Sequence, residues 1–190
     1  MPNGTLGSLM NQNFISVKKA IDLFIKVLFA LEYMHSKEYL HRDIKPDNIL
    51  LDKKGNPKLS DFGLSNTIEE CVKNPKGYFT HLAPEYFQKQ ENNKQTYNYA
   101  ASITLYRIIN NYKNWPQIIE SAKIKEKDII CGKLISKIGF MSWIPEKIKR
   151  VINKATNRDP NKRFKTITEF KNALSKLNII GICDENFESH

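Results

Sequence analysis

The chain has 190 residues, a length that suits a single folded domain with a sizeable core. Apolar residues make up 41% of the sequence and charged residues 26%, and this balance argues against a disordered chain. The formal net charge is +10, but arginine supplies only five of the 30 basic residues and no basic run is interleaved with aromatic residues, which argues against a nucleic-acid-binding surface.

The first predicted elements are a turn within residues 1–15, which leads into a short helix, and a long helix over residues 17–36. Proline and glycine within the first seven residues indicate the turn. In the long helix, apolar side chains recur at three- and four-residue steps, and Ser16 is a suitable N-cap in front of it.

A small β-hairpin is predicted next, with strands at residues 49–51 and 57–60 and a turn over residues 52–56. Residues 61–83 then show no periodic pattern and are expected to form a long irregular loop. A loop of that length inside a compact domain is usually functional or mobile, so this region is a candidate for functional residues.

The second half of the chain predicts helices. Apolar periodicity starts near residue 97, and helices are expected at residues 99–112, 115–125 and 145–157. A last helix is expected to start at Thr166, which would form a capping box with Glu169.

The whole pattern predicts a mainly α fold with a small β-hairpin. One domain is expected over residues 1–178, followed by a tail over residues 179–190. The most apolar segment, residues 20–34, is too short and too charged to span a membrane. The three cysteines are widely spaced and form no C-x-x-C, so neither a disulfide framework nor a zinc site is predicted, and we expect a soluble cytoplasmic protein.

Four oxygen-bearing side chains flank the predicted hairpin, namely Asp43, Asp47, Asn48 and Asp61. Because the loops at the two ends can face each other, these groups can converge on one site. Mg²⁺ takes oxygen ligands, typically one or two carboxylates together with phosphates and water, and Asn48 and Asp61 suit it. Lys45 places a cation beside Asp43, which suits the attack of a hydroxyl on a phosphate. The alternative is a set of solvated surface carboxylates.

Three motifs occur in order along the chain. They are His41-Arg42-Asp43-Ile44-Lys45-Pro46-Asp47-Asn48, Asp61-Phe62-Gly63 and Ala83-Pro84-Glu85. In this order, with a strand pair between the first two, they resemble the catalytic loop, the metal-binding D-F-G and the end of the activation segment of eukaryotic-type protein kinases. The resemblance extends from residue 1 to about residue 178 and implies the C-terminal, catalytic lobe of a serine/threonine-type kinase.

This resemblance implies a chemical role for each matching residue. Asp43 would orient the substrate hydroxyl and accept its proton, and Lys45 would steady the γ-phosphate of ATP. Asn48 and Asp61 would hold Mg²⁺, and Leu50 would form the floor under the adenine. ATP and Mg²⁺ are therefore the expected cofactors.

The resemblance also implies structural residues. His41 and Phe62 would stack in the hydrophobic spine that couples the two lobes of a kinase, and Gly63 completes the D-F-G motif. Glu85 would pair with Arg163 in a structural ion pair.

Regulation would centre on Arg42, which is expected to bind a phosphate in the activation segment. Thr67, Tyr78 and Thr80 are the candidate phosphorylation sites, although most loop hydroxyls are merely solvated. Tyr78 stands where the family has a threonine and His81 where it has a tyrosine, so the docking of a substrate is expected to differ.

The sequence departs from the family elsewhere as well. It starts at or after the hinge that joins the two kinase lobes, and it contains no G-x-G-x-x-G. Tyr97 stands where the family has an aspartate that hydrogen-bonds the catalytic-loop backbone, and Ser102 where it has a glycine. We therefore expect a different geometry around His41 and Arg42.

These features predict a protein kinase domain for serine/threonine phosphorylation with Mg-ATP. The activity is expected to be weak or absent in the chain alone, because the glycine-rich loop over the phosphates is missing. Loss of even one electrostatic stabiliser costs roughly 10²–10³ in rate. The alternative is a non-catalytic, pseudokinase-like scaffold or binding module. Leu50 and Phe62 would form an exposed apolar face, so we expect a protein substrate or a protein partner that covers it, and no membrane.

Overall fold

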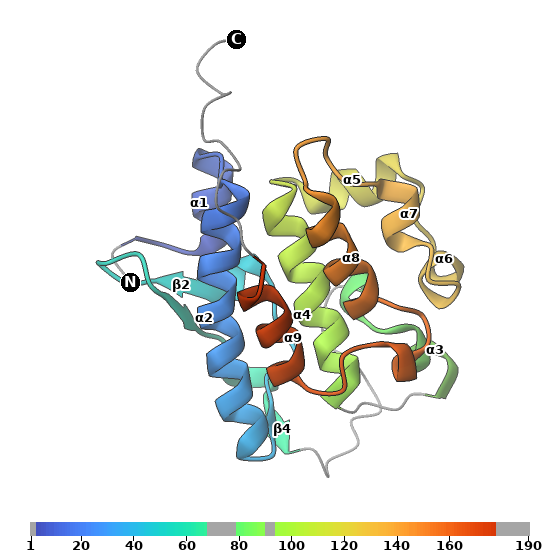
Figure 1. Cartoon of the computed structure of the whole chain (residues 1–190), viewed down its shortest axis with the longest axis horizontal. Coiled ribbons are helices and arrows are strands. Elements are labelled where there is room, and N and C mark those ends of the chain that lie inside the picture. The colour runs from blue at the N-terminus through green and yellow to red at the C-terminus, as the bar shows by residue number, and fades with distance from the viewer. Residues whose placement is uncertain (1–2, 68–78, 90–93, 178–190) are drawn as a thin grey trace.

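The structure is a computed structural model that describes residues 3–67, 79–89 and 94–177. The described elements of the first half are α1 (Leu6–Gln12), α2 (Val17–Ser36), β1 (Tyr39–Leu40), β2 (Ile49–Leu51), β3 (Pro57–Leu59) and β4 (Asn66–Thr67). Those of the second half are α3 (Pro84–Lys89), α4 (Lys94–Ile109), α5 (Trp115–Ser121), α6 (Glu126–Ile130), α7 (Leu134–Ile138), α8 (Glu146–Ala155) and α9 (Ile167–Ser175). Short 3₁₀ turns occur at Pro46–Asn48, Phe62–Leu64, Phe79–His81 and Pro160–Lys162. The predicted fold class, mainly α with a small hairpin, is confirmed (Figure 1).

Helix α2 forms one side of the domain. Ser16 caps it as predicted, because its Oγ accepts a hydrogen bond from the Lys19 amide at 3.3 Å. The apolar stripe of α2 is buried, whereas Phe29 and Tyr33 are 55% and 67% exposed. The buried stripe packs against α4, α9 and β3, and α9 lies alongside α2 (Figure 1). Neither α2 nor any other helix within the described ranges has the length and apolar character needed to cross a membrane.

The predicted hairpin is present. Strands β2 and β3 pair antiparallel with Ile49 opposite Leu59, and β3 ends one residue before the predicted boundary. The turn is closed by Asp52, whose Oδ1 accepts hydrogen bonds from the amides of Lys54 and Asn56 at 2.9 and 2.8 Å. These bonds hold the two strands in register.

A second strand pair was not predicted. Strands β1 and β4 pair antiparallel, with Tyr39 opposite Thr67 and Leu40 opposite Asn66. Each strand has only two residues, which is too short to produce an alternating pattern in the sequence. The pair brings the start of the catalytic-loop segment next to the residues that follow the D-F-G motif.

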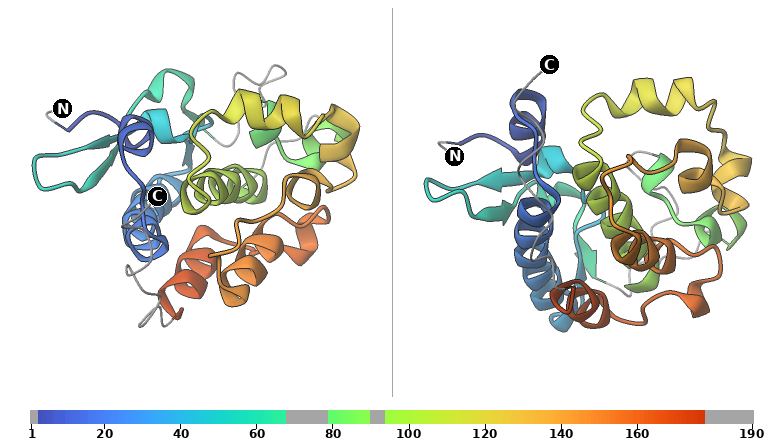
Figure 2. Two further views of the ribbon diagram at one scale, coloured as in Figure 1. Left: turned by 90° about the horizontal axis from the view of Figure 1, so that it is seen from above. Right: turned by 45° about the horizontal axis from the view of Figure 1, so that its top comes forward.

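Helix α4 runs through the middle of the domain, with α2 and α9 on one side and α5 to α8 on the other (Figure 2). It begins at Lys94, before the predicted start, and ends at Ile109 instead of residue 112. The earlier end has a backbone cause, since Asn111 adopts a left-handed φ of 52° that a right-handed helix cannot continue. Within α4, Ile103 and Leu105 are fully buried.

The segment after α4 is more divided than predicted. The expected helix over residues 115–125 ends at Ser121, and Lys123 has a left-handed φ of 50°. Helices α6 and α7 were not predicted, because helices of five residues are too short for an apolar repeat.

The last two helices match their predictions closely. Helix α8 starts just after Pro145 and lies within the predicted range of 145–157. Helix α9 is capped by Thr166, whose Oγ1 accepts from the Glu169 amide at 3.1 Å. The second bond of the expected capping box differs, because the Glu169 carboxylate accepts from the amide of Lys165 at 2.9 Å.

One buried ion pair joins α3 to the turn before α9. Two Arg163 nitrogens donate to the two Glu85 carboxylate oxygens, each at 2.7 Å. Both residues are buried, at 3% and 8% exposed, and Thr96 of α4 donates a further hydrogen bond to Glu85 at 3.1 Å. The pair therefore ties three separate segments together.

We predict that Glu85→Gln lowers the free energy of unfolding by about 3–5 kcal/mol, because it leaves the Arg163 charge buried without its counter-charge. Asp22→Asn is the control, since Asp22 pairs with Lys18 on the surface with side chains 56% and 61% exposed. That change should stay within about 0.5 kcal/mol. Urea denaturation measures both, and equal effects of the two substitutions would refute the structural role of Glu85.

Candidate active site

The segment between β1 and β2 folds around the Asp43 carboxylate. Its Oδ2 accepts a hydrogen bond from Lys45 Nζ at 2.7 Å and another from Asn48 Nδ2 at 2.8 Å. Asn48 Nδ2 also donates to the Asp43 carbonyl at 2.9 Å. Asp43 is only 9% exposed, so these donors compensate a carboxylate that is almost removed from water.

The hairpin brings Asp61 to the same place. The Ser60 amide and the Ser60 hydroxyl both donate to the Asn48 carbonyl, each at 3.0 Å. Asp61 is the next residue, and its left-handed φ of 61° turns the chain sharply into the 3₁₀ turn that follows. Asp43, Asn48 and Asp61, which the sequence analysis singled out together, are therefore neighbours in the structure.

The residues at this point fit a magnesium ion. The Asn48 amide is oriented with its NH₂ toward Asp43, which leaves Oδ1 as the oxygen that can act as a ligand. Asp61 adds an exposed carboxylate. The described residues contain no cluster of three His, Cys, Asp or Glu side chains that could hold a metal by themselves. One carboxylate and one amide oxygen nevertheless suffice for Mg²⁺ when phosphates and water complete its shell.

His41 and Phe62 lie together at the edge of the site. Their ring centroids are 5.2 Å apart, and His41 Nε2 lies 2.9 Å from the Ser60 carbonyl, to which it must donate. His41 is 1% exposed, whereas Phe62 is 52% exposed. Burial lowers the pKa of His41, and the Ser60 carbonyl and the carboxylates of Asp43 and Asp61 only partly oppose that effect. His41 is therefore neutral near pH 7.

The loop that contains Arg42 contacts α4 through Tyr97. The Tyr97 phenol is hydrogen-bonded to the Arg42 guanidinium; burial raises the pKa of Tyr97, and Arg42 opposes that rise. Arg42 has a left-handed φ of 72°, which is uncommon for a residue with a long side chain. Two residues further on, the carbonyl of Ile44 accepts a hydrogen bond from Thr104 at 2.7 Å.

Leu50 lies on β2, beside the site. It pairs with Lys58 across the hairpin and forms a single bridge with Thr5 near the N-terminus. Its side chain is half-buried. A place for the adenine at Leu50 stays a prediction.

The structure treats the candidate phosphorylation sites differently. Tyr78 lies outside the described residues, and for Thr67 only the backbone is described. Thr80 is 1% exposed, and its Oγ1 accepts a hydrogen bond from Trp115 Nε1 at 2.9 Å. In this conformation a kinase cannot reach the Thr80 hydroxyl, and its phosphorylation would require the segment to open.

A cationic and aromatic cluster lies next to Thr80. The Arg107 guanidinium stands over the Trp115 ring at 5.2 Å, and the His81 ring meets Trp115 edge-on at 6.3 Å. Burial, followed by the positive charges of Arg107 and Lys45, holds the pKa of His81 well below its ordinary value. The sequence analysis did not find Arg107, because one buried arginine leaves no pattern.

Sequence reasoning also missed Thr104 and Ser60, which support the predicted site residues. Both are small residues whose hydroxyl groups donate hydrogen bonds to backbone carbonyls far away in the sequence. Thr104 gives one faint signal, since it is a β-branched polar residue between the apolar residues Ile103 and Leu105 of a predicted helix.

Comparison with known proteins agrees with this geometry. The family model for the protein kinase domain matches residues 1–174. The chain belongs to the protein kinase family. The predicted membership is therefore confirmed, and the match ends four residues before the predicted domain boundary at residue 178.

Several curated kinases are similar over part of their length. The serine/threonine-protein kinase R436 of Acanthamoeba polyphaga mimivirus is 34% identical over 177 residues, which are 88% of this chain and 60% of that protein. The cAMP-dependent protein kinase catalytic subunit PRKX of Homo sapiens is 33% identical over 113 residues, 59% of this chain and 32% of that one. The serine/threonine-protein kinase PrkC of Bacillus subtilis is 29% identical over 158 residues, which are 81% of this chain and 24% of that protein. This kinase chain thus spans less than two thirds of each.

We predict that the kinase chain loses stability as the pH falls below 6.5. The unfolded chain then binds protons on His41 and His81, whose ordinary pKa is 6.5, whereas the folded chain binds fewer protons there because both pKa values are lowered. Each residue should lower the free energy of unfolding by up to about 1.4 kcal/mol per pH unit, and the effect should fade as the pH rises past about 7.5.

Urea denaturation at pH 7.5, 6.5 and 5.5 measures this dependence. His81→Gln should reduce the slope, because glutamine does not titrate. Carboxylates with a lowered pKa, such as Glu32 with an ordinary value of 4.5, act only at lower pH and do not interfere. Equal stability of the unsubstituted chain at pH 7.5 and 5.5 would contradict the prediction.

Proposed function

We propose that the chain carries the catalytic-loop side of a serine/threonine protein kinase that uses Mg-ATP. The observation that carries this proposal is the arrangement around Asp43, in which Lys45 and Asn48 hold Oδ2 and Asp61 follows Ser60 into the same place. The names of the curated relatives support serine and threonine as acceptors. Lys45, the cation beside Asp43, agrees with that class.

In the proposed reaction, Asp43 is the base. Both of its hydrogen bonds within the loop go to Oδ2, so Oδ1 is the oxygen that would accept the proton of a serine or threonine hydroxyl. The hydroxyl oxygen bonds to the γ-phosphorus while the bond to the bridging oxygen breaks, which yields a phosphoester and ADP. Lys45 would steady the transferred phosphate, and Asn48 and Asp61 would hold Mg²⁺, which neutralises phosphate charge when bound.

The nucleotide needs a second wall. The 190 residues contain no G-x-G-x-x-G, and the curated relatives are longer than the matched segment. We propose that polypeptide outside these residues supplies that wall and covers the half-buried Leu50 and the exposed Phe62. Without it, the kinase activity of the chain should be weak.

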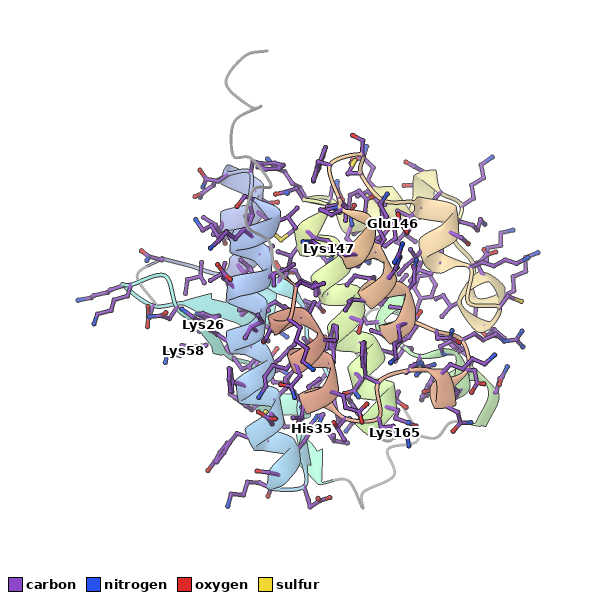
Figure 3. All side chains as sticks on the ribbon, viewed as in Figure 1. Lys26, His35, Lys58, Glu146, Lys147 and Lys165 are labelled. Carbon is purple, nitrogen blue, oxygen red and sulfur yellow. The ribbon has the colours of Figure 1, made fainter. Side chains whose placement is uncertain are left out.

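A groove beside Phe62 supports a contact with such a polypeptide. It has a volume of about 590 Å³, and its apolar lining includes Tyr33, Met34 and Phe62. Lys26 of α2 and Lys58 of β3 lie on the same side of the molecule and flank it (Figure 3). The contacting segment would therefore present apolar side chains beside acidic ones.

The second candidate function is a pseudokinase-like binding module. Two observations favour it, namely the exposed apolar face at Phe62 and the phenol of Tyr97 in the place of a carboxylate. In this case the same groove serves protein binding, and no phosphate transfer takes place.

Nucleotide binding is predicted to stabilise the chain. Mg-ATP at ten times its dissociation constant should raise the free energy of unfolding by about 1.4 kcal/mol. Asp61→Asn should remove the magnesium-dependent part, whereas Asp22→Asn, far from the site, should leave it unchanged. Thermal unfolding with and without Mg-ATP measures the shift. No shift at millimolar nucleotide would argue against a nucleotide site in the chain alone and favour the binding module.

Phosphate transfer to a serine/threonine peptide library is the direct test of the reaction. We predict slow transfer that Asp43→Asn reduces by about 10²–10⁴, because asparagine cannot accept the hydroxyl proton. Labelled phosphate from ATP reports the rate. Transfer that survives Asp43→Asn, or that appears on tyrosine, would contradict the proposed mechanism.

The exposed apolar face at Phe62 and Tyr33 is tested by dye binding and by self-association of the chain. We expect the isolated chain to bind a hydrophobic dye, and Phe62→Ser with Tyr33→Ser to reduce that binding at least twofold, since both exposed rings are removed. Dye fluorescence and analytical ultracentrifugation measure the effect. A monodisperse monomer that binds little dye would contradict an uncovered docking face.

A further inference from the structure

Thr104 links the central helix to the catalytic loop. Its Oγ1 donates a hydrogen bond to the carbonyl oxygen of Ile44 at 2.7 Å, across 60 positions of sequence. Both residues are buried, at 0% and 4% exposed. Ile44 lies between the two proposed catalytic residues, Asp43 and Lys45, and its bonded carbonyl belongs to the peptide unit that joins Ile44 to Lys45.

The hydroxyl has a choice of acceptors. Thr104 Oγ1 lies 3.1 Å from the Ala100 carbonyl, which is the acceptor that a threonine within a helix commonly uses. A hydroxyl has one proton, and the shorter distance is to Ile44. The bond to the loop is therefore preferred over the bond within the helix.

The other polar bonds around Asp43 are of a different kind. Lys45 and Asn48 bind Asp43 from within the same loop through their side chains. The backbone amide of Asn48 also donates to the Lys45 carbonyl at 3.0 Å. These bonds set the loop residues relative to one another. They do not fix the position of the loop relative to the core of the domain, whereas the hydrogen bond from Thr104 does.

Tyr97 and Thr104 form two supports on one face of α4. They are seven residues apart, which is close to two full helical turns, so their side chains point the same way. Tyr97 contacts Arg42 and Thr104 contacts Ile44, on the two sides of Asp43. Figure 2 shows the segment between β1 and β2 next to α4 in both views.

We propose that Thr104 is a positioning residue that holds the Asp43–Lys45 segment against the core and thereby sets the direction of the Asp43 carboxylate. This inference rests on the proposed function for its catalytic meaning, but not for its structural content. The neutral hydroxyl of Thr104, on α4, donates to the Ile44 carbonyl in the loop. In the same helix, Tyr97 stands at the position of the expected aspartate.

The test compares Thr104→Val, which has the same shape but no donor, with Thr104→Ser, which keeps the donor. Ser102→Ala is the matched control, because the buried Ser102 hydroxyl donates only within α4, to the Asn98 carbonyl at 2.6 Å. Hydrogen exchange followed by NMR gives the readout at the Asn48 backbone amide. Thr104→Val should speed exchange at Asn48 about tenfold relative to amides of α2, since the Ile44 carbonyl loses its partner.

Thr104→Ser should restore exchange at Asn48 to within about threefold of the unsubstituted chain, and Ser102→Ala should leave it unchanged relative to α2. If Thr104→Val does not fold, Thr104→Ala replaces it, because it removes the donor and introduces no larger group. Equal acceleration at Asn48 and throughout α2 and α9 would show a general stability effect and would overturn the proposal. Unchanged exchange at Asn48 would also overturn it.

The outcome is separate from that of the proposed function. Exchange at Asn48 is measured without nucleotide, so it decides the role of Thr104 even if the chain transfers no phosphate. Where transfer is measurable, Thr104→Val should lower kcat about tenfold or more with little change in KM for ATP, because the misdirected group is the base and not the nucleotide site. A rise in KM with unchanged kcat would contradict a positioning role.

Discussion

Asp43 is only 9% exposed, and a charge so far from water is tolerated only where donors face it. Lys45 and Asn48 meet this need, and in doing so they determine the path of the chain. Asn48 must reach back to Asp43, so the loop closes through a 3₁₀ turn and β2 begins directly afterwards. The hairpin then sets Ser60 against Asn48, and Asp61 follows. The geometry of the site thus depends on compensating one buried negative charge.

Buried polar groups are also compensated around the central helix α4. α4 carries buried polar side chains, and several of them bind the backbone of irregular segments that have no partner strand or helix. Asn98 donates to the Phe164 carbonyl and Thr104 to the Ile44 carbonyl, and Asn110, the residue just after α4, accepts from the Met141 amide. A buried backbone group needs such a partner. Polar residues in this helix therefore hold loops in place, which a wholly apolar helix would not do.

This division explains what the sequence could and could not predict. The long helix at residues 17–36, the hairpin and the cap at Thr166 follow from local patterns, and all three are present. Helices of five residues and strands of two leave no periodic signal. In the site, short motifs identified Asp43, Asn48 and Asp61, because the residues of each motif are close together in the sequence. The support from Thr104 stayed hidden, since its partner lies 60 residues away and either residue alone is unremarkable in type.

The same distinction bears on how a kinase motif should be interpreted. A motif specifies which residues reach a site. Here Asn48 donates hydrogen bonds to Asp43, and Asp61 directly follows Ser60, which donates to the Asn48 carbonyl. The motif does not specify what holds these residues. Tyr97 replaces an expected carboxylate, yet the loop remains tied to α4 through Arg42 and Ile44. Because a hydroxyl and a phenol are neutral, this support adds no further negative charge beside Asp43, whose carboxylate remains paired with Lys45.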